Sequence, residues 1–188
     1  MKHLTVKEKE KEAFEKMKAG FHYKNVMAAP TMKKVVVNVG TGTMVKKDKD
    51  KNDAISTRLA KITGQKPTLK GAKKSIASFK VRQGDPIGVV VTLRGKRMFA
   101  FLEKLINVAL PRTKDFRGIA RSVVDDIGNL SIGIKEHTIF PETADEDIRD
   151  VFGMTLTLVS SAKTKKEGMA FFELLGVPFK KEEETKKK

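Results

Sequence analysis

Alternation of hydrophobic and polar residues predicts several β-strands in this chain. The clearest strand spans Ile87 to Arg94, where a large aliphatic residue occupies every second position from Ile87 onward. A period of two places those side chains on one face of a sheet and the residues between them on the other. The same pattern predicts strands over Lys33 to Val39, Leu130 to Ile134 and Met154 to Val159.

Hydrophobic residues at helical spacing predict helices between and around these strands. The expected helices span about residues 6–19, 53–63, 96–110 and 165–175. Gly64 follows the second at the position of a left-handed cap, and Pro111 is expected to end the third. Thr164 and Glu167 fit a capping box that opens the last helix, which Gly176 ends.

Strands with one polar face, interspersed with helices, predict an α+β fold. We expect a mostly antiparallel or mixed sheet with helices packed on one face, an open polar face and a long basic loop for RNA. With 188 residues, 39% of them hydrophobic, the chain is expected to form one domain over residues 1–179. Residues 1–22 are predicted to hold a peripheral helix, and residues 180–188 form a low-complexity charged tail.

Charge is concentrated in one part of the chain. Residues 33–82 carry 14 basic and 3 acidic side chains, whereas residues 121–188 carry 11 and 13. From Ala54 to Gly84 there is no Asp or Glu at all. Phosphates attract Lys and Arg and repel carboxylates, so this stretch predicts a surface that binds a polyanion. The alternative is an ordinary solvated basic face.

Few residues of the chain are placed to catalyse a reaction or to bind a metal. The chain has no Cys, and His3, His22 and His137 lie far apart, without metal-ligand or catalytic-triad spacing. An enzyme acting on RNA would need a base or metal group near the basic stretch, which holds neither carboxylate nor histidine. We therefore predict no enzyme, cofactor, metal or small-molecule substrate. A general RNA chaperone remains open as an alternative.

An acidic cluster follows Pro141, consisting of Asp145, Glu146, Asp147 and Asp150. It lacks the central Gly and terminal Glu of a calcium-binding loop. We expect it either to stabilise the start of a short helix or to meet a basic protein partner. No stretch is apolar enough to span a membrane, and the first residues lack the apolar core of a signal peptide. We expect a cytosolic protein.

Five sequence blocks occur in an order that indicates a protein family far more specifically than the charge does. They are YKNVMAAPTMKKVVVNVG (Tyr23 to Gly40), ITGQKPTLKGAKKSIASFKVRQGDPIG (Ile62 to Gly88), VTLRGKRMFAFLEKLINVALPRTKDFRG (Val91 to Gly118), GIKEHTIFPE (Gly133 to Glu142) and LLGVPF (Leu174 to Phe179). With these blocks the chain resembles the bacterial-type "L-five" family of large-subunit ribosomal proteins. Between Val124 and Ser131 it lacks two aromatic residues and a glycine that the family usually has.

The resemblance implies a structural, ribosome-bound protein of the cytoplasm. Its implied partners are 5S rRNA, which it helps attach in the central protuberance, the 23S-type large-subunit rRNA, P-site tRNA and a basic protein of the small-subunit head. The implied 5S rRNA residues are Asn38, Gln65, Lys66, Lys70, Thr92 and Arg94. The strand pattern independently places Asn38, Thr92 and Arg94 on polar strand faces, where ordinary solvated residues are the alternative.

The resemblance also implies two further contact regions. The basic loop would reach tRNA through Lys73, Lys74, Ser78, Phe79, Lys80, Arg82 and Gln83. The bridge to the small subunit would involve Arg112, Asp115, Phe116, Arg117, Asp145, Glu146, Asp147 and Asp150.

Overall fold

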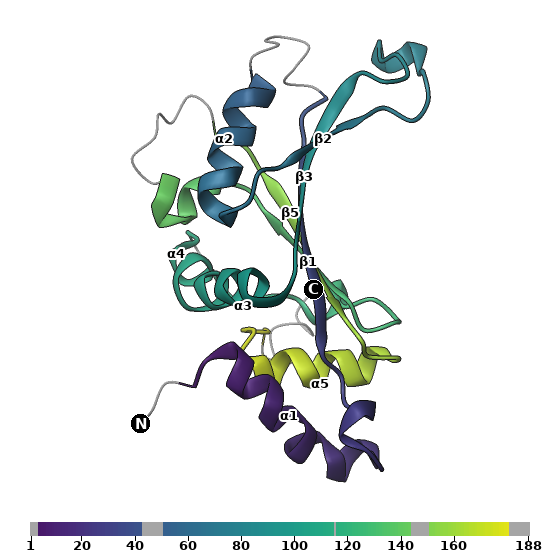
Figure 1. Ribbon diagram of the computed structural model, residues 1–188, viewed down its shortest axis with the longest axis vertical. Coiled ribbons are helices and arrows are strands. Elements are labelled where there is room, and N and C mark those ends of the chain that lie inside the picture. Colours follow the sequence, from purple (N-terminus) through teal and green to yellow (C-terminus); the bar gives the residue numbers. More distant parts are fainter. Residues whose placement is uncertain (1–3, 43–50, 115, 144–150, 181–188) are drawn as a thin grey trace. The chain divides into compact units, whose positions relative to one another are not determined.

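The protein has an α+β fold built on a five-stranded antiparallel sheet, as the sequence predicted (Figure 1). The computed structural model describes residues 4–42, 51–114, 116–143 and 151–180. The strands are β1 (Met32–Gly40), β2 (Thr68–Gly71), β3 (Pro86–Leu93), β4 (Leu130–Ile134) and β5 (Met154–Ser160). Their order across the sheet is β2-β3-β1-β5-β4. The four strands predicted from alternation are confirmed to within a residue at either end.

The chain divides into two compact units. Unit 1 comprises Met1–Val35, Arg94–Ile132 and Thr157–Lys188, and unit 2 comprises Val36–Leu93 and Gly133–Leu156. The single domain expected over residues 1–179 stays a prediction.

In unit 1, helix α1 (Val6–Phe21) lies beside helix α5 (Lys165–Leu175), as Figure 1 shows. Helix α1 begins with a capping box, in which the amide of Thr5 donates to the Glu8 carboxylate over 2.8 Å and the Thr5 hydroxyl accepts from the Glu8 amide. It ends at His22, whose φ of 53° is left-handed. The predicted helix over residues 6–19 is therefore confirmed, with two more residues at its end.

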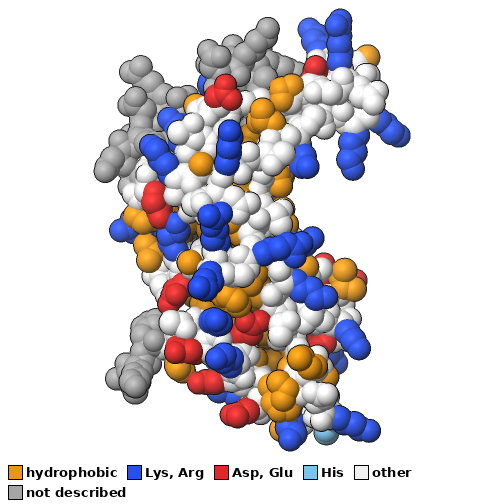
Figure 2. Space-filling view, in the orientation of Figure 1, with side chains coloured by type: hydrophobic (Ala, Val, Ile, Leu, Met, Phe, Trp, Pro, Cys, Tyr) orange, Lys and Arg blue, Asp and Glu red, His pale blue; other side chains and the backbone are white. Residues whose placement is uncertain are grey.

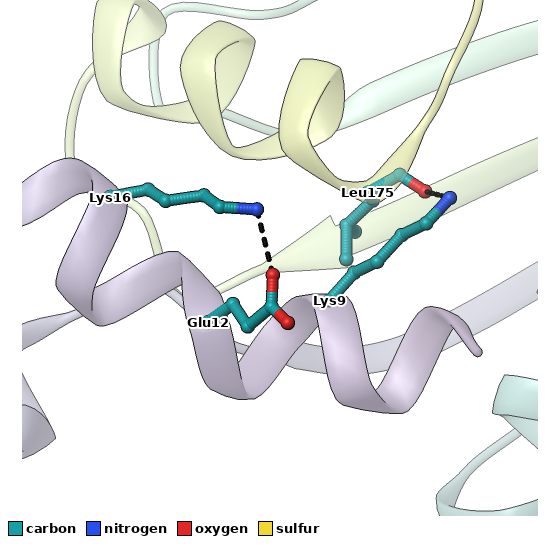
Figure 3. A network of polar contacts seen from close by, with 4 residues as sticks. All are labelled: Lys9, Glu12, Lys16 and Leu175. Carbon is teal, nitrogen blue, oxygen red and sulfur yellow. Dashed lines mark hydrogen bonds and ion pairs between the residues drawn. The ribbon is translucent and has the colours of Figure 1, made fainter. Parts of the chain in front are cut away.

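One polar contact joins α1 to the end of α5 (Figure 3). The Lys9 ammonium donates a 3.4 Å hydrogen bond to the carbonyl oxygen of Leu175, in the last turn of α5. A cation is favoured there because the last carbonyls of a helix have no partner within the helix. On the same helix Glu12 and Lys16 form an exposed ion pair of 2.7 Å, which contributes little to stability.

The start of α5 is held by a buried carboxylate. The Thr164 hydroxyl accepts from the Glu167 amide over 3.3 Å, as predicted for a helix cap. The Glu167 carboxylate accepts from the Lys163 amide over 2.8 Å and also from the Tyr23 hydroxyl. Only the threonine half of the predicted capping box is therefore present, because a full box would direct this carboxylate to the Thr164 amide. Burial, together with the hydrogen bond to this carboxylate, raises the pKa of the Tyr23 phenol well above its usual range.

The predicted helix over residues 96–110 is longer than expected. It consists of α3 (Gly95–Lys104), a π-helical turn η3 (Leu105–Ala109) and a last turn α4 (Leu110–Arg112). Pro111 therefore does not end the helix. The π-helical turn directly before it is wider than an α-turn, and this local change accommodates a residue that lacks the amide donor.

In unit 2, helix α2 (Lys51–Thr63) packs against strand β3. Its side chains Ile55, Leu59 and Ile62 are buried, and Gly64 follows with a φ of 67°, as predicted. Short 3₁₀ turns complete the two units: η1 (Val26–Ala28), η2 (Ala77–Phe79), η4 (Arg121–Val123), η5 (His137–Ile139) and η6 (Pro141–Thr143).

Candidate nucleic-acid interface

The exposed side of strands β2, β3 and β1 brings two of the predicted RNA-binding residues together. Lys70 in β2 is paired with Gly88 in β3. A Cβ atom built on Gly88 would lie 3.9 Å from Asn38 Oδ1, in β1, and 4.0 Å from Lys70 Cβ. Gly88 itself is buried, and the exposed side chains of Asn38 and Lys70 lie on either side of it. Thr92, further along β3, is exposed as well.

The segment after α2 is tied to the end of β3. The Gln65 side-chain amide donates a 3.3 Å hydrogen bond to the carbonyl oxygen of Thr92. The Thr63 hydroxyl donates to the carbonyl oxygens of Leu59, over 2.7 Å, and Gln65, over 3.1 Å. These contacts hold Gln65 half-buried and leave the next residue, Lys66, exposed. Gln65, Lys66 and Thr92 thus lie in one region of unit 2.

Arg94 belongs to unit 1 and directly precedes α3. Its side chain is exposed, and its Nη1 donates a 3.4 Å hydrogen bond to the carbonyl oxygen of Lys33, also in unit 1. The contact orients the guanidinium along the start of β1. A guanidinium has five N–H donors, so further donors can serve solvent or a ligand.

The predicted basic loop is an internally paired arm. We call residues 72–85, between β2 and β3, the basic arm; Figure 1 shows it extending beyond the ends of the two strands. At its base the Ala72 amide donates to the Asp85 carbonyl over 2.8 Å, and the Gly84 amide donates to the Ala72 carbonyl over 3.0 Å. Further out, Ile76 and Val81 form an antiparallel bridge. Sequence patterns missed this pairing because the bridge is isolated and too short for alternation to reveal it.

The outer part of the arm presents the residues predicted to reach tRNA. Turn η2 ends at Lys80, which has a left-handed φ of 50°. The exposed predicted residues are Lys73, Lys74, Ser78, Phe79, Lys80, Arg82 and Gln83. Figure 2 shows Lys and Arg side chains gathered over this arm. The arm also contains one carboxylate, that of Asp85, which accepts from the Arg82 amide over 2.7 Å.

A groove of about 900 Å³ lies between the arm and the exposed strand face within unit 2. Its polar lining consists of Asn38, Lys70, Lys73 and Lys74, and its other lining consists of Gly40, Gly42, Gly71, Ala72, Ile76, Phe79, Val81, Ile87 and Gly88. Lysines attract phosphates, whereas bare backbone and apolar side chains admit sugars and base faces. The groove therefore combines cationic and amide side chains with an apolar and glycine-rich lining.

A second hollow, of about 390 Å³, adjoins Asn38 on the side of β5 and β4. It is lined by Asn38, Gly40, Gly133, Ile134, Lys135, Gly153, Met154 and Thr155. Sequence reasoning did not select Lys135 or the glycines. Alternation in β4 indicated that Gly133 lies on the polar face, but no sequence signal indicated that β4 lies two strands away from β1.

The predicted bridge residues are only partly described. In unit 1, Arg112 and Arg117 are exposed and Phe116 is half-buried. Asp115, Asp145, Glu146, Asp147 and Asp150 lie outside the described residues, so the bridge assignment stays a prediction.

Within the described ranges no group of three or more acidic or histidine side chains could hold a metal ion. His137 is buried and stacks on Phe152 with ring centroids 4.1 Å apart, and its Nδ1 accepts from the Phe152 amide over 3.3 Å. These contacts give His137 a packing role in unit 2. None of the helices in the part of the chain that is described is long and apolar enough to cross a bilayer.

Comparison with known proteins gives matches over most of the chain. The family model described as ribosomal protein L5 matches residues 25–82, and the model of the C-terminus of the same ribosomal family matches residues 86–179. The two matched ranges contain every predicted site residue, from Asn38 to Asp150.

Curated relatives agree with the family models. The large ribosomal subunit protein uL5 of Halothermothrix orenii is 49% identical over 159 residues, covering 85% of this chain and 88% of the relative. Its counterpart of the same name in Trichlorobacter lovleyi is 47% identical over 169 residues, covering 90% of this chain and 94% of the relative. The uL5 protein of Mycoplasma mycoides subsp. mycoides SC is 49% identical over 160 residues, with coverages of 85% and 88%.

Proposed function

This chain belongs to the ribosomal protein L5 family, and we propose that it binds 5S rRNA through the exposed strand face of unit 2. It is a protein of the large ribosomal subunit, bound to the ribosome in the cytoplasm, and not an enzyme. Its implied RNA-binding residues are Asn38, Gln65, Lys66, Lys70, Thr92 and Arg94.

One observation carries the proposal: Asn38 and Lys70 flank Gly88 across three adjacent strands. An amide that both donates and accepts hydrogen bonds, near an ammonium group, can bind phosphates, 2′-hydroxyls and exposed base edges. The acid-free stretch from Ala54 to Gly84 adds a field that favours phosphates and contains no competing carboxylate.

The basic arm is proposed to contact P-site tRNA. Its backbone pairing supports the exposed cations Lys73, Lys74, Lys80 and Arg82, and the arm extends beyond the ends of β2 and β3 (Figure 1). An arm of this kind can reach a second RNA while the strand face is occupied. We extend the proposal to the 23S-type rRNA and, through Arg112, Phe116, Arg117 and the acidic cluster, to a basic protein of the small-subunit head.

The direct test is binding of the purified chain to 5S rRNA and to a random RNA of equal length at near-physiological salt. We expect saturable, one-to-one binding that prefers 5S rRNA and weakens steeply with salt, by about 0.7–0.9 in the log-log slope per phosphate contact. Equal affinity for the two RNAs would contradict the proposal. Several chains bound to each RNA would instead favour a general RNA chaperone.

Variants separate specific from general binding. Asn38→Ala and Thr92→Val remove polar groups without changing charge, so they should weaken 5S binding more than random-RNA binding. Lys166→Ala, on the exposed side of α5 in unit 1, is the control and should weaken both RNAs slightly and equally. If Asn38→Ala reduced the affinity for both RNAs equally, Asn38 would be an ordinary solvated residue with no specific contact to 5S rRNA.

A further inference from the structure

Two glycines on the exposed strand face are not required by the fold. Gly40 ends β1 and Gly133 lies within β4, and both are exposed. A Cβ atom on either would meet nothing within 4 Å. Neither has a positive φ, so their backbone is open to any residue. Packing and conformation therefore give no reason for glycine at these positions.

Two other glycines of unit 2 have a clear structural reason. A Cβ on Gly71 would lie 3.0 Å from the Gly84 carbonyl oxygen, and one on Gly153 would lie 3.0 Å from the Ile134 carbonyl oxygen. A Cβ on Gly88 or Gly42 would make only ordinary contacts, 3.4 Å from the Val39 carbonyl oxygen and 3.7 Å from Ile87 Cβ respectively. Close backbone approach thus accounts for Gly71 and Gly153, whereas at Gly40 and Gly133 an added Cβ would meet no atom of the protein within 4 Å.

Glycine weakens a strand, because it loses more conformational freedom on folding than other residues and has no side chain to pack. A strand glycine without an internal reason therefore points to a ligand that approaches the backbone closely. Gly40 and Gly133 line the same 390 Å³ hollow, with Asn38, Lys135 and Thr155 around them. The two positions thus lie on one surface.

We propose that Gly40 and Gly133 are positioning residues that keep this surface bare, so that the sugar-phosphate backbone of double-stranded RNA can lie directly against the strands. The inference rests on the proposed RNA-binding function, and it adds that the RNA is double-stranded where it meets this part of the face. The wide, shallow minor groove of an RNA duplex offers 2′-hydroxyls and phosphates that a flat surface can reach.

Charge favours RNA over a protein partner. The described residues lining this hollow and the neighbouring groove include Lys70, Lys73, Lys74 and Lys135 and no Asp or Glu. Asn38 lines both hollows, so a duplex on the strand face would meet a hydrogen-bonding amide between Lys135 and the three lysines of the groove. A side chain at Gly40 or Gly133 would hold the duplex away from all of these groups.

The test compares Gly40→Ala, Gly133→Ala and Gly133→Val with Gly20→Ala. Gly20, in α1, also has nothing within 4 Å of an added methyl group and no positive φ, so it is a matched control. We expect all four variants to fold, with unfolding midpoints equal to or above that of the original chain. We expect Gly133→Val to raise the Kd for 5S rRNA by about tenfold, equivalent to about 1.4 kcal/mol, the alanine variants to raise it less, and Gly20→Ala to leave it unchanged.

The outcomes separate this inference from the proposed function. Original affinity in Gly133→Val would overturn the inference while leaving the 5S assignment intact. Unfolding of the Gly40 and Gly133 variants would overturn it too, because the fold would then need these glycines. An equal loss of affinity for a single-stranded RNA of the same length would contradict the duplex contact. If the original chain showed no preference for 5S rRNA, the proposed function would fail, and this inference with it.

Discussion

The side-chain amide of Gln65 donates a 3.3 Å hydrogen bond to the carbonyl oxygen of Thr92, 27 residues later in the chain. This bond fastens the segment after α2 to the end of β3. It thereby places Gln65 and Lys66 beside Thr92, an exposed residue that the strand pattern independently predicted to lie on a polar face. Several residues proposed to meet RNA therefore depend on one another for their positions.

Gln65→Ala should weaken RNA binding because it removes both a proposed RNA contact and the bond that positions this segment. Loss of the bond to Thr92 should cost about 0.5–1.5 kcal/mol of folding stability, measured by urea unfolding. The affinity for 5S rRNA should fall more than that for random RNA, measured by filter binding. Lys166→Ala is the control, because this exposed residue of α5 in unit 1 belongs to none of the proposed contacts and should leave the preference for 5S rRNA unchanged. A 5S affinity unchanged by Gln65→Ala would remove Gln65 from the interface.

Lys73 and Lys74 should contribute to tRNA binding as exposed cations of the basic arm. Replacing both with Gln should reduce the salt dependence of tRNA binding by about 0.7–0.9 in slope for each phosphate that is no longer neutralised. Folding stability should stay unchanged, since both side chains are exposed. The double replacement of Lys163 and Lys166, exposed residues at the start of α5, removes the same charge and is the control. Equal slopes for the two double variants would show that only net charge matters.

Tyr23 should make the protein sensitive to alkaline pH. The folded state holds the phenol proton well above the ordinary pKa of 10.0, whereas the unfolded chain releases it near that value. The stabilisation is therefore complete below about pH 10 and is lost as the pH rises above it. Because Tyr23 is the only Tyr and the chain has no Trp, ultraviolet absorbance of the phenolate reports this residue alone. We expect phenolate formation to coincide with alkaline unfolding.

Tyr23→Phe tests the same hydrogen bond at neutral pH. It removes one partner of the Glu167 carboxylate, which belongs to a residue that is 7% exposed, and should cost roughly 1–2 kcal/mol. As the pH rises above about 10, the folding stability of this variant should fall less than that of the original chain. Free titration of Tyr23 near pH 10 in the folded protein would contradict the buried hydrogen bond.

Two helix glycines should respond in opposite directions to replacement by alanine. A Cβ on Gly168, in α5, would lie 2.5 Å from the Cα of Gly128, and backbone atoms cannot move aside cheaply. Gly168→Ala should therefore destabilise unit 1 by about 1–3 kcal/mol. Gly20→Ala should stabilise α1 by about 0.5–1 kcal/mol, because its methyl group meets nothing. Thermal unfolding of both variants checks the signs, and a stabilised Gly168→Ala variant would contradict the close approach.

Local patterns in the chain were sufficient to predict the class of the fold and most of its elements. The alternation in β3 and the helical spacing in α2 arise from burial of one face, which adjacent residues report directly. The acid-free stretch indicated a polyanion surface, and the order of the motifs indicated the family, which the comparisons confirmed. The prediction that Pro111 ends the helix was wrong. The rule that proline stops an α-helix does not allow for the π-helical turn that precedes it.

Interactions between distant parts of the chain decided the rest. The strand order β2-β3-β1-β5-β4 places Asn38 beside Gly88 and Lys70, and brings Gly40 and Gly133 to one hollow. The approach of Gly168 to Gly128 likewise joins residues 40 positions apart. Periodicity records which face of an element is buried, but it carries no information about which element covers that face. The concentration of positive charge was therefore visible in the chain itself, whereas the grouping of Asn38 and Lys70 around Gly88 exists only once the strands have paired.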